Sequence, residues 1–384
     1  MIYYSQFQKR ILPMKILFAA TVDIHIVNHH LRTIHALHEL GHNVDVAANG
    51  DYTNPDIHDK FNVCFSKSPT SKDNINAYFF MKQLLKERQY DIISCHTPLS
   101  SFFTRLAARS TDSKVIYTAH GFHFYQGAPL INNTVYKTME RIGARYTDTL
   151  VTINQEDCHA AKAFTLKPGG EVRYIPGVGV DLADIRNAEI SRREARERMG
   201  IPWDAFLLFS AGELNKNKNH LFVIRALQDF FHHHPDLHYV ICGRDLWNGT
   251  YEAVIKELDL ERQVHLLGYR EDVRSLLYGA DAYLSPSFRE GLPVSVIEAM
   301  SVGLLVIASD VRGNHDLIDS GKDGLLYQVS DSNQFLDCFR QVYENKSLRC
   351  SLGNAAKEKA KFYSKEAIDP QIMSLYETKK GNRT

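Results

Sequence analysis

At 384 residues the chain is too long for one ordinary hydrophobic core and fits two domains of roughly 180 residues each. Hydrophobic residues make up 44% and charged residues 23%, which is typical of a globular protein and excludes a disordered or fibrous one. Lys and Arg number 45 and so do Asp and Glu, so the chain has no net positive charge with which to attract nucleic acid.

The start of the chain gives no sign of export. Residues 1–13 lack the apolar core of a signal peptide, and no apolar run approaches the roughly 20 residues that span a bilayer. Six cysteines are scattered without a Cys-x-x-Cys pair, as is usual for buried thiols in a reducing compartment. We therefore expect a cytoplasmic protein whose membrane contact, if any, is peripheral and at the inner face of the cell membrane. Residues 1–13 are expected to be a flexible extension, or to precede the native start at Met14.

From Met14 onward, short apolar runs alternate with longer amphipathic ones, which indicates a parallel sheet covered by helices. This pattern predicts a first domain over residues 14–181. Its expected strands are Ile16–Ala20, Val44–Ala48, Val63–Phe65, Ile92–Cys95, Val115–Ala119, Leu150–Ile153 and Val172–Ile175. Its expected helices are 27–40, 74–88, 99–109, 132–146 and 155–164.

The Gly- and Pro-rich segment Ile175–Asp181 is the natural boundary, and a second alternation follows it. We expect a second domain over 182–362 and a helical segment, 363–384, that packs back toward the first domain. The expected strands are Phe206–Ser210, Tyr239–Cys242, Val264–Leu266, Ala282–Leu284 and Leu305–Ala308. The expected helices are 192–199, 219–233, 250–258, 271–278, 293–302, 331–344, 347–362 and 366–378.

The predicted fold class is therefore α/β, with two doubly wound, Rossmann-like domains that face a cleft. Ligands of open parallel sheets bind beyond the carboxyl ends of the strands, so the residues after each strand are the candidates for function.

Two carboxylates, Glu290 and Glu298, flank a Gly-Leu-Pro turn before a predicted helix. Pro293 suits the first helical position, so the amides of Gly291 and Leu292 are left without helical partners at the positive end of the helix dipole. Such a helix start favours phosphate. With an acid on either side to reach hydroxyl groups, the pattern predicts a nucleotide sugar as the ligand.

A loop with two lysines follows the predicted strand Phe206–Ser210. Gly212 allows close approach of the backbone to a ligand, and Lys216 and Lys218 offer the ammonium groups that a diphosphate leaving group needs. Taken alone, the loop could equally be a solvated stretch that happens to hold lysines. Its position before a helix, in the same domain as Glu290, favours phosphate binding.

Among the 18 histidines, His120 follows a strand and has Gly121 beside it. It could contact the donor sugar or its developing charge, although a lone histidine is more often structural. Helical i, i+4 spacing relates two further pairs, and a run of three closes a helix, but no convincing third ligand accompanies them: His25/His29, His38/His42 and His232–His234. We therefore expect no metal site and no cofactor.

The order Glu290-Gly291-Leu292-Pro293 with Glu298 eight positions after the first acid resembles the Glu-(seven residues)-Glu signature of retaining glycosyltransferases with the GT-B fold. That class includes glycogen-synthase-like enzymes and many bacterial polysaccharide glycosyltransferases. Further segments resemble the family in the same order: 176–181, 267–269 and 306–310. The resemblance covers nearly the whole chain from Met14.

The resemblance implies a role for each candidate residue. Glu298 would accept hydrogen bonds from the ribose, Glu290 would hold sugar hydroxyls, and Lys218 would stabilise the diphosphate. The amides of Gly291 and Leu292 would lie near the sugar or phosphate, Gly212 and Lys216 would complete the donor site, and Gly268 and Tyr269 would form the base-contacting loop. Two departures stand out: Glu213 replaces the family's usual Arg, and residues 20–25 lack its glycine-rich turn.

The expected reaction is transfer of a sugar from a nucleotide-diphosphate sugar, with a UDP-sugar as the favoured donor, to an acceptor hydroxyl with retention. The expected acceptor is a lipid-linked saccharide in the assembly of capsular polysaccharide, exopolysaccharide or O-antigen. Two alternatives stay open: a nucleotide-sugar epimerase or hydrolase of similar fold, and a non-catalytic nucleotide-sugar-binding protein. Helix 74–88 carries both aromatic residues and lysines, so it fits either an anionic membrane surface or the core of the first domain.

Overall fold

The computed structural model describes residues 12–66, 68–125 and 127–377. Contacts within the chain divide it into two compact units, which are residues 1–178 with 369–384, and residues 179–368. The sequence places the first boundary after Asp181 and the return at residue 363, whereas the contacts place them after Val178 and after Ile368. Most of the predicted extension, residues 1–11, lies outside the described residues.

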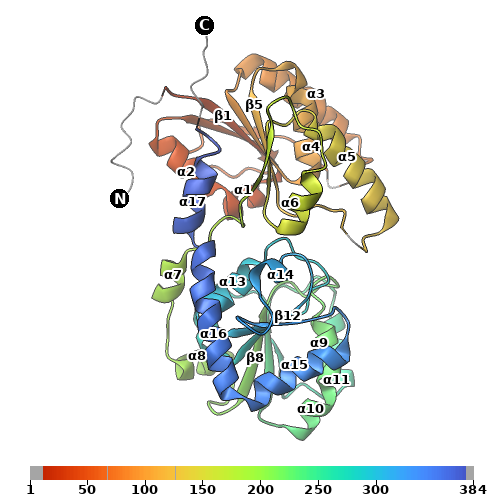
Figure 1. Cartoon of the computed structure of the whole chain (residues 1–384), viewed down its shortest axis with the longest axis vertical. Helices are drawn as coiled ribbons and strands as arrows, with labels where there is room; N and C mark the ends of the chain where they lie inside the picture. The colour runs from red at the N-terminus through yellow and green to blue at the C-terminus, as the bar shows by residue number, and fades with distance from the viewer. Residues whose placement is uncertain (1–11, 67, 126, 378–384) are drawn as a thin grey trace. The chain divides into compact units, whose positions relative to one another are not determined.

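The first unit (Figure 1) is built on a parallel sheet. Its seven strands are paired in the order β3-β2-β1-β4-β5-β6-β7. From β1 the chain adds β2 and β3 on one side of β1, and it then crosses back to add β4 on the other side of β1. The strand order therefore reverses between β1 and β4. The strands are β1 (Lys15–Val22), β2 (Asn43–Asn49), β3 (Lys60–Asn62), β4 (Ile92–His96), β5 (Lys114–Ala119), β6 (Thr149–Thr152) and β7 (Glu171–Tyr174).

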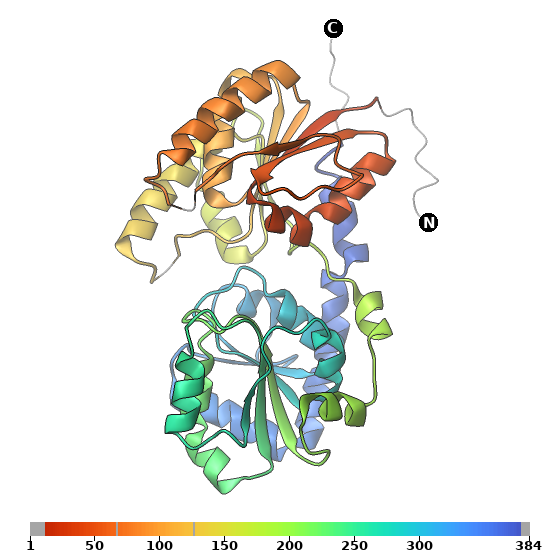
Figure 2. The ribbon, with the colours of Figure 1, turned by 180° about the vertical axis from the view of Figure 1, so that it is seen from behind.

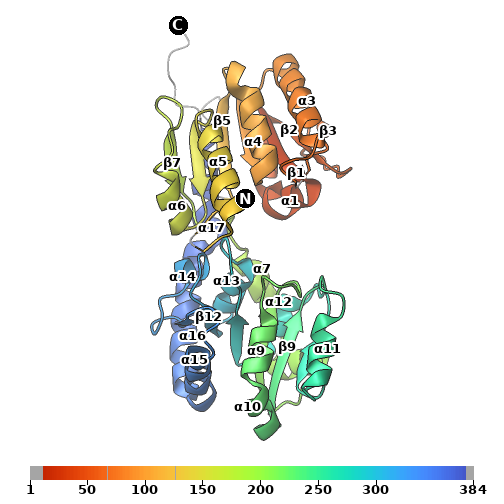
Figure 3. The same cartoon turned by 90° about the vertical axis from the view of Figure 1, so that its right-hand side faces the viewer.

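Helices cover both faces of this sheet. The helices that follow β3, β4 and β5 lie side by side on one face (Figure 3), and the two helices between β1 and β2 lie on the other (Figure 2). The helices are α1 (Asp23–His29), α2 (Leu31–Glu39), α3 (Asp73–Arg88), α4 (Pro98–Ala107), α5 (Lys137–Ala144) and α6 (Gln155–Ala161). A last helix, α17 (Lys365–Met373), brings Asp369 to Arg32 of α2, at 2.7 Å from carboxylate oxygen to guanidinium nitrogen.

A buried ion pair ties two of these helices together. Arg105 of α4 is fully buried, and its Nη2 donates to Glu140 Oε2 of α5 at 2.9 Å. Tyr117 donates its hydroxyl to the other oxygen of Glu140 at 2.7 Å, and its ring lies 4.0 Å below the guanidinium. A side chain at Gly143 would place a Cβ 2.6 Å from that guanidinium, which explains the glycine there. A buried charge pair of this kind requires both partners.

The second unit has a parallel sheet of six strands in the order β10-β9-β8-β11-β12-β13. Its strands are β8 (Phe206–Ala211), β9 (Leu237–Cys242), β10 (Val264–Leu266), β11 (Ala282–Ser285), β12 (Leu305–Ser309) and β13 (Leu325–Tyr327). One face carries α9 (His220–Ala226), α10 (Gln228–His233), α11 (Thr250–Glu257) and α15 (Ser332–Glu344), and the other carries α8 (Arg192–Met199), α13 (Val294–Ser301) and α16 (Lys346–Ala360) (Figure 1). The shorter helices are α7 (Leu182–Asn187), α12 (Val273–Leu276) and α14 (Asn314–Leu317).

Four details of the predicted elements are wrong. The strand expected at 63–65 lies at 60–62, because β3 is a short edge strand paired only to β2. The helix expected over 27–40 is interrupted at His30, whose backbone leaves the helical region at φ −127°. The strand expected to end at Ala20 continues to Val22, and α1 begins directly after it at Asp23. Strand β13 and helices α7 and α14 were not predicted, because each is too short for a clear periodicity.

Helix α3 was expected either to pack in the core of the first domain or to lie on a membrane surface, and it has features of both. Ala77, Met81, Leu84 and Leu85 are buried in the core of the unit, so the helix does pack on the sheet. Phe79 and Phe80 are nevertheless 61% and 44% exposed, which leaves apolar rings on the outer surface. Over the described parts of the chain, no helix is both long and apolar enough to cross a bilayer.

Candidate functional site

The central contact of the second unit joins two sequence-predicted residues, Lys218 and Glu290. Lys218 Nζ donates to Glu290 Oε1 at 2.8 Å, and the hydroxyl of Ser287 donates to the same oxygen at 2.5 Å. The side chains are 23% and 10% exposed, so the pair is largely shielded from water yet still reachable by a ligand. Both residues follow strands of the sheet, β8 and β11, at its carboxyl edge, where the strand pattern predicts a ligand.

Backbone hydrogen bonds hold the two loops of this pair together. The amide of Phe288 donates to the carbonyl of Asn217 at 2.8 Å, and Asn217 Nδ2 donates to the carbonyl of Arg289 at 3.0 Å. Asn219 Nδ2 donates to the carbonyl of Pro286 at 3.1 Å. Asn217 and Asn219, on either side of Lys218, therefore fix the position of Lys218 beside Glu290, and the loop is not a merely solvated stretch.

Two glycines permit this close packing. A Cβ at Gly212 would lie 3.1 Å from Lys218 Cε, so the lysine side chain crosses directly over that residue. Gly313 has a φ of +83°, and a Cβ there would lie 2.7 Å from the carbonyl oxygen of Gly291. Arg312 Nε donates to the carbonyl of Glu290 at 3.1 Å. Sequence reasoning missed Arg312 and Gly313, which follow β12 and hold the Glu290–Gly291 backbone.

Helix α13 begins directly after this turn. Its first helical residue is Val294, with Pro293 as the N-cap, one position later than predicted. Gly291 and Leu292 lie just before the helix, and the Leu292 side chain is buried as an anchor. The positive end of the helix dipole is thus directed at the backbone that carries Glu290 and Gly291, which favours a negatively charged group there.

Glu298 lies within α13 and has a partner that sequence reasoning did not identify. Arg274 of α12 donates from Nε to Glu298 Oε1 at 2.9 Å, and it also pairs with Asp184 of α7. Burial raises the pKa of Glu298, and the hydrogen bond and charge of Arg274 oppose that rise. Glu298 is therefore a fixed, largely buried hydrogen-bond acceptor.

The other predicted donor residues lie around this centre. Gly268 has a φ of +64°, and its carbonyl accepts from the amide of Gly243 at 2.8 Å. The ring of Tyr269 is 61% exposed and has the guanidinium of Arg244 4.6 Å from its centroid. Its exposed, polarised ring face is suited to stacking on a planar base.

Lys216 is placed differently from Lys218. It is exposed and, with Trp247 and Phe288, lines an open hollow of about 550 Å³ beside α9. Glu213, which stands where the family usually has Arg, accepts from Asn215 Nδ2 at 3.1 Å. The structure thus brings Lys218 to Glu290 and gives Lys216 no comparable contact with an acid among the described salt bridges.

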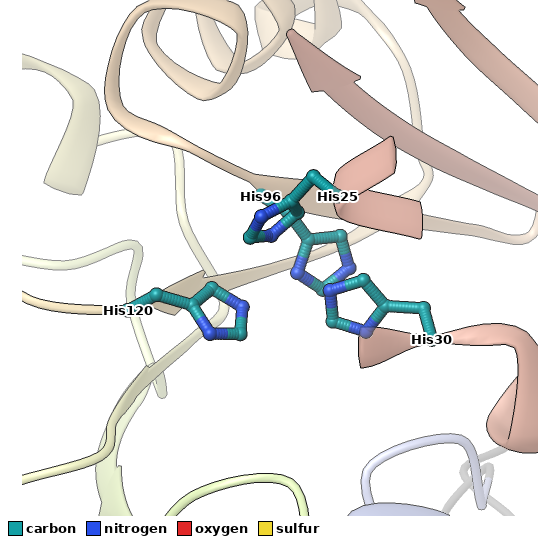
Figure 4. Close-up of side chains that lie close together, drawn as sticks. All are labelled: His25, His30, His96 and His120. Atoms are coloured by element: carbon teal, nitrogen blue, oxygen red, sulfur yellow. The ribbon is translucent and has the colours of Figure 1, made fainter. Parts of the chain in front are cut away.

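In the first unit, His120 lies at the carboxyl end of β5 among three other histidines (Figure 4). His25 comes from α1, His30 from the break between α1 and α2, and His96 from the end of β4. Burial lowers the pKa of His25 to about 3 and holds the pKa values of the other three well below the usual value. The rings are therefore neutral at neutral pH.

Sequence spacing could not identify this group. It pointed to the i, i+4 pair of His25 and His29, whereas the cluster is assembled from four segments that only the sheet brings together. His38 is exposed on α2, and His42 is buried beyond it, with its Nδ1 accepting from the amide of Met14 at 3.1 Å. The expectation of no metal ligands thus rested on a search along the sequence alone.

A hollow of about 390 Å³ opens beside the histidines in the same unit. Its lining combines polar groups from the ends of β1 and β4 with the rings of two aromatic residues that follow β5. The lining residues include His25, His29, Thr97, His123 and Tyr136. Its size and mixed lining suit a saccharide.

Comparison with known proteins gives matches over most of the chain. Residues 15–154 match the family described as Glycosyl transferase 4-like, and residues 191–359 match Glycosyl transferases group 1. The chain is 35% identical over 366 residues to a protein of Bacillus subtilis (strain 168) named as the glycosyltransferase EpsD, covering 94% of this chain and 96% of that one. It is 30% identical over 291 residues to the UDP-Gal:alpha-D-GlcNAc-diphosphoundecaprenol alpha-1,3-galactosyltransferase of Escherichia coli, covering 73% of this chain and 75% of that one.

Among solved structures, HepE of Anabaena in complex with UDP has the same fold. The TM-score is 0.76 at 18% identity, and the match covers 94% of this chain and 99% of that one. The predicted pair of Rossmann-like parallel-sheet domains is confirmed by this likeness. With a relative 35% identical along almost its whole length, the chain belongs to the group 1 family of glycosyltransferases.

Proposed function

We propose that this glycosyltransferase transfers a sugar, with retention, from a UDP-sugar to a hydroxyl of a lipid-linked saccharide. The observation that carries the proposal is the contact of Lys218 with Glu290 in front of helix α13. The ammonium group of Lys218 and the start of α13 would stabilise the charged leaving group. The carboxylate of Glu290 beside them would bind the hydroxyl groups of the sugar.

The ion pair suggests how the two roles are linked. A diphosphate bound at the start of α13 would attract the ammonium group of Lys218 away from Glu290. Glu290 would then keep the hydrogen bond from Ser287 and turn its remaining capacity to the sugar hydroxyls. Lys218 and the helix dipole would balance the leaving-group charge, so we propose that no divalent ion on the diphosphate is required.

Retention fits the surroundings of Glu290. Its Oε1 already accepts hydrogen bonds from both Lys218 and Ser287, so we propose that this carboxylate binds sugar hydroxyls. It does not attack the anomeric carbon, and no covalent sugar–enzyme intermediate forms in the proposed reaction. We propose a front-face reaction, in which the departing phosphate oxygen takes the proton of the acceptor hydroxyl as that hydroxyl bonds to the anomeric carbon. His120 keeps the proposed role of a contact to the sugar or to its developing charge.

The nucleoside would be held by residues around α13. Glu298, fixed by Arg274, is proposed to accept hydrogen bonds from the ribose hydroxyls, and the exposed ring of Tyr269 and the backbone of Gly268 to contact the base. Gly212 and Lys216 complete the proposed donor site. Uridine is favoured because HepE, which has the same fold, was solved with UDP.

The acceptor proposal rests on the first unit. The hollow beside His25 is lined by Tyr136, and the segment just before it exposes Leu130, Ile131 and Val135, at 83%, 65% and 38%. A lipid-linked saccharide has an apolar chain to cover such residues, and the name of the E. coli relative includes a diphosphoundecaprenol-linked sugar. We propose a role in surface-polysaccharide assembly at the inner face of the membrane.

Peripheral contact with an anionic membrane is a separate part of the proposal. Helix α3 exposes Phe79 and Phe80 and carries Lys82 and Lys86, a combination suited to an acidic lipid surface. Flotation with anionic and neutral vesicles tests it, with the double variant Phe79→Ser/Phe80→Ser as the matched change. Equal binding to both vesicle types would rule it out.

The transfer reaction is tested with a panel of UDP-sugars, other nucleotide sugars and synthetic diphospho-lipid saccharides, with products identified by mass spectrometry. We expect one UDP-sugar to be consumed only when an acceptor is present. Nuclear magnetic resonance of the product should show an α-linkage from an α-configured donor. A β-linkage would exclude retention, and a rate that rises with added Mg²⁺ or Mn²⁺ would exclude the metal-free leaving group.

A further inference from the structure

Four buried ring nitrogens in the histidine cluster lack hydrogen-bond partners among the residues that the structure describes. They are His25 Nε2, His30 Nε2, His96 Nδ1 and His120 Nε2. Buried polar atoms are normally satisfied, so four unsatisfied atoms gathered at one place indicate a partner that is bound there. One nitrogen from each ring lies within 4.8 Å of those of the other three (Figure 4).

The chemistry of the cluster narrows the class of that partner. Each unsatisfied ring nitrogen can present a lone pair to a metal ion, because imidazole in its neutral form is a common metal ligand. Mg²⁺ and Ca²⁺ prefer oxygen ligands, and none of the four ligands is a carboxylate. Imidazole suits Zn²⁺ and its neighbours in the first transition row.

We propose that His25, His30, His96 and His120 form a binding site for one transition-metal ion, with Zn²⁺ as the favoured ion. Four ligands are the usual number for Zn²⁺, and Zn–N bonds of about 2.1 Å place tetrahedral nitrogens about 3.4 Å apart. The four nitrogens lie within 4.8 Å of one another, so binding the ion would bring the most distant of them closer by at most about 1.4 Å.

A hydrogen-bond chain already orients one of the ligands. Ser94 Oγ lies 3.1 Å from His96 Nε2 and 2.9 Å from the hydroxyl of Tyr376. Because Nε2 is engaged in this way, Nδ1 is the nitrogen that is left for the cluster. Metal-binding histidines are commonly held by such a bond from the second ring nitrogen.

A second group with metal-ligand chemistry in the same unit is less suited. Asp45, His58 and Asp59 also lie within reach of one another. Their carboxylates already have partners, since the Tyr90 hydroxyl donates to Asp45 Oδ2 at 2.6 Å and Arg88 donates to Asp59 Oδ2 at 2.8 Å. The four-histidine cluster differs in that its buried nitrogens are unsatisfied.

The test uses the full chain without a polyhistidine tag. The chain is stripped with a chelator, loaded with Zn²⁺ and dialysed, and its metal content is measured. We expect one Zn²⁺ per chain, and with Co²⁺ the intense visible absorption of a tetrahedral site. His30→Gln and His96→Gln should each weaken binding at least about tenfold, and Ser94→Ala about 10- to 100-fold.

Two control variants separate this site from weaker surface binding. His58→Gln and the triple change His232→Gln/His233→Gln/His234→Gln should each leave one tight Zn²⁺ per chain. The proposal is overturned if wild-type protein retains no Zn²⁺ and shows no tetrahedral Co²⁺ spectrum, or if binding survives His30→Gln and His96→Gln. Because the wild-type spectrum needs no variant and no sugar donor, the outcome does not depend on the proposed transfer reaction.

Discussion

The ion pair between Lys218 and Glu290 leads to an unusual prediction for Glu290→Gln. Lys218 Nζ donates to Glu290, so in the proposed donor site a diphosphate would have to compete with Glu290 for that ammonium group. The side chains of Lys218 and Glu290 are 23% and 10% exposed, so the ion pair contributes about 0.5–1 kcal/mol that diphosphate binding would have to overcome. In Glu290→Gln the glutamine can still accept the hydrogen bond from Ser287, so only the ion pair is lost. Removing the negative charge should therefore tighten the binding of UDP by about two- to fivefold.

Turnover by Glu290→Gln should fall, because a glutamine amide holds sugar hydroxyls less strongly than a carboxylate does. Isothermal titration of UDP and steady-state kinetics with the chosen donor give the two quantities on the same preparations. Glu271→Gln, which removes an exposed acid of the same unit, is the matched control and should change neither. Unchanged or weaker UDP binding by Glu290→Gln would refute the competition between Glu290 and the diphosphate.

Three further changes test other parts of the structure. Lys218→Ala should lower kcat by about 10²- to 10³-fold while the fold is kept, and transfer at the wild-type rate would remove its role at the diphosphate. Arg105→Met should lower the unfolding free energy by about 3–5 kcal/mol, because it leaves Glu140 charged and buried without its partner. Denaturant unfolding measures this loss. The control is Arg109→Met, which changes an exposed arginine and should stay within about 0.5 kcal/mol of wild type. His220 is 2% exposed, and burial lowers its pKa to about 3, so its own contribution to the unfolding free energy should be full above pH 6.5 and about 2 kcal/mol smaller at pH 5, where the unfolded chain takes up the proton. The other buried histidines add to the total pH dependence, so the test is the difference between wild type and His220→Gln in denaturant unfolding at the two pH values, and equal slopes would contradict the prediction.

The sheets of both units were predictable because their strands are buried on both faces and appear as continuous apolar runs. The expected runs from Ile16 and from Phe206 became β1 and β8 with end positions shifted by two residues or fewer. The elements that escaped prediction, such as β3 at its true position, α7 and α14, are three to six residues long. Such short elements are set by contacts with neighbouring parts of the chain, which local periodicity does not report.

The candidate site of the second unit was predictable where its residues lie close together in the sequence. Glu290, Gly291 and the start of α13 are consecutive, and Lys218 follows another strand of the same sheet. Arg274 and Arg312 were missed because an arginine near a turn is ordinarily a surface residue. Only the folded chain places the first on Glu298 and the second on the carbonyl of Glu290.

The histidine cluster shows why a search along the chain fails for a site of this kind. Its members come from α1, from the break after α1, and from the ends of β4 and β5, and β4 is the neighbour of both β1 and β5 in the sheet. The same topology that places nucleotide and sugar sites at the carboxyl edge of parallel strands therefore gathers these rings. Since each buried neutral ring costs free energy unless its nitrogens are paired, four of them at the reversal point of the strand order are best explained by a ligand that pairs with all four at once.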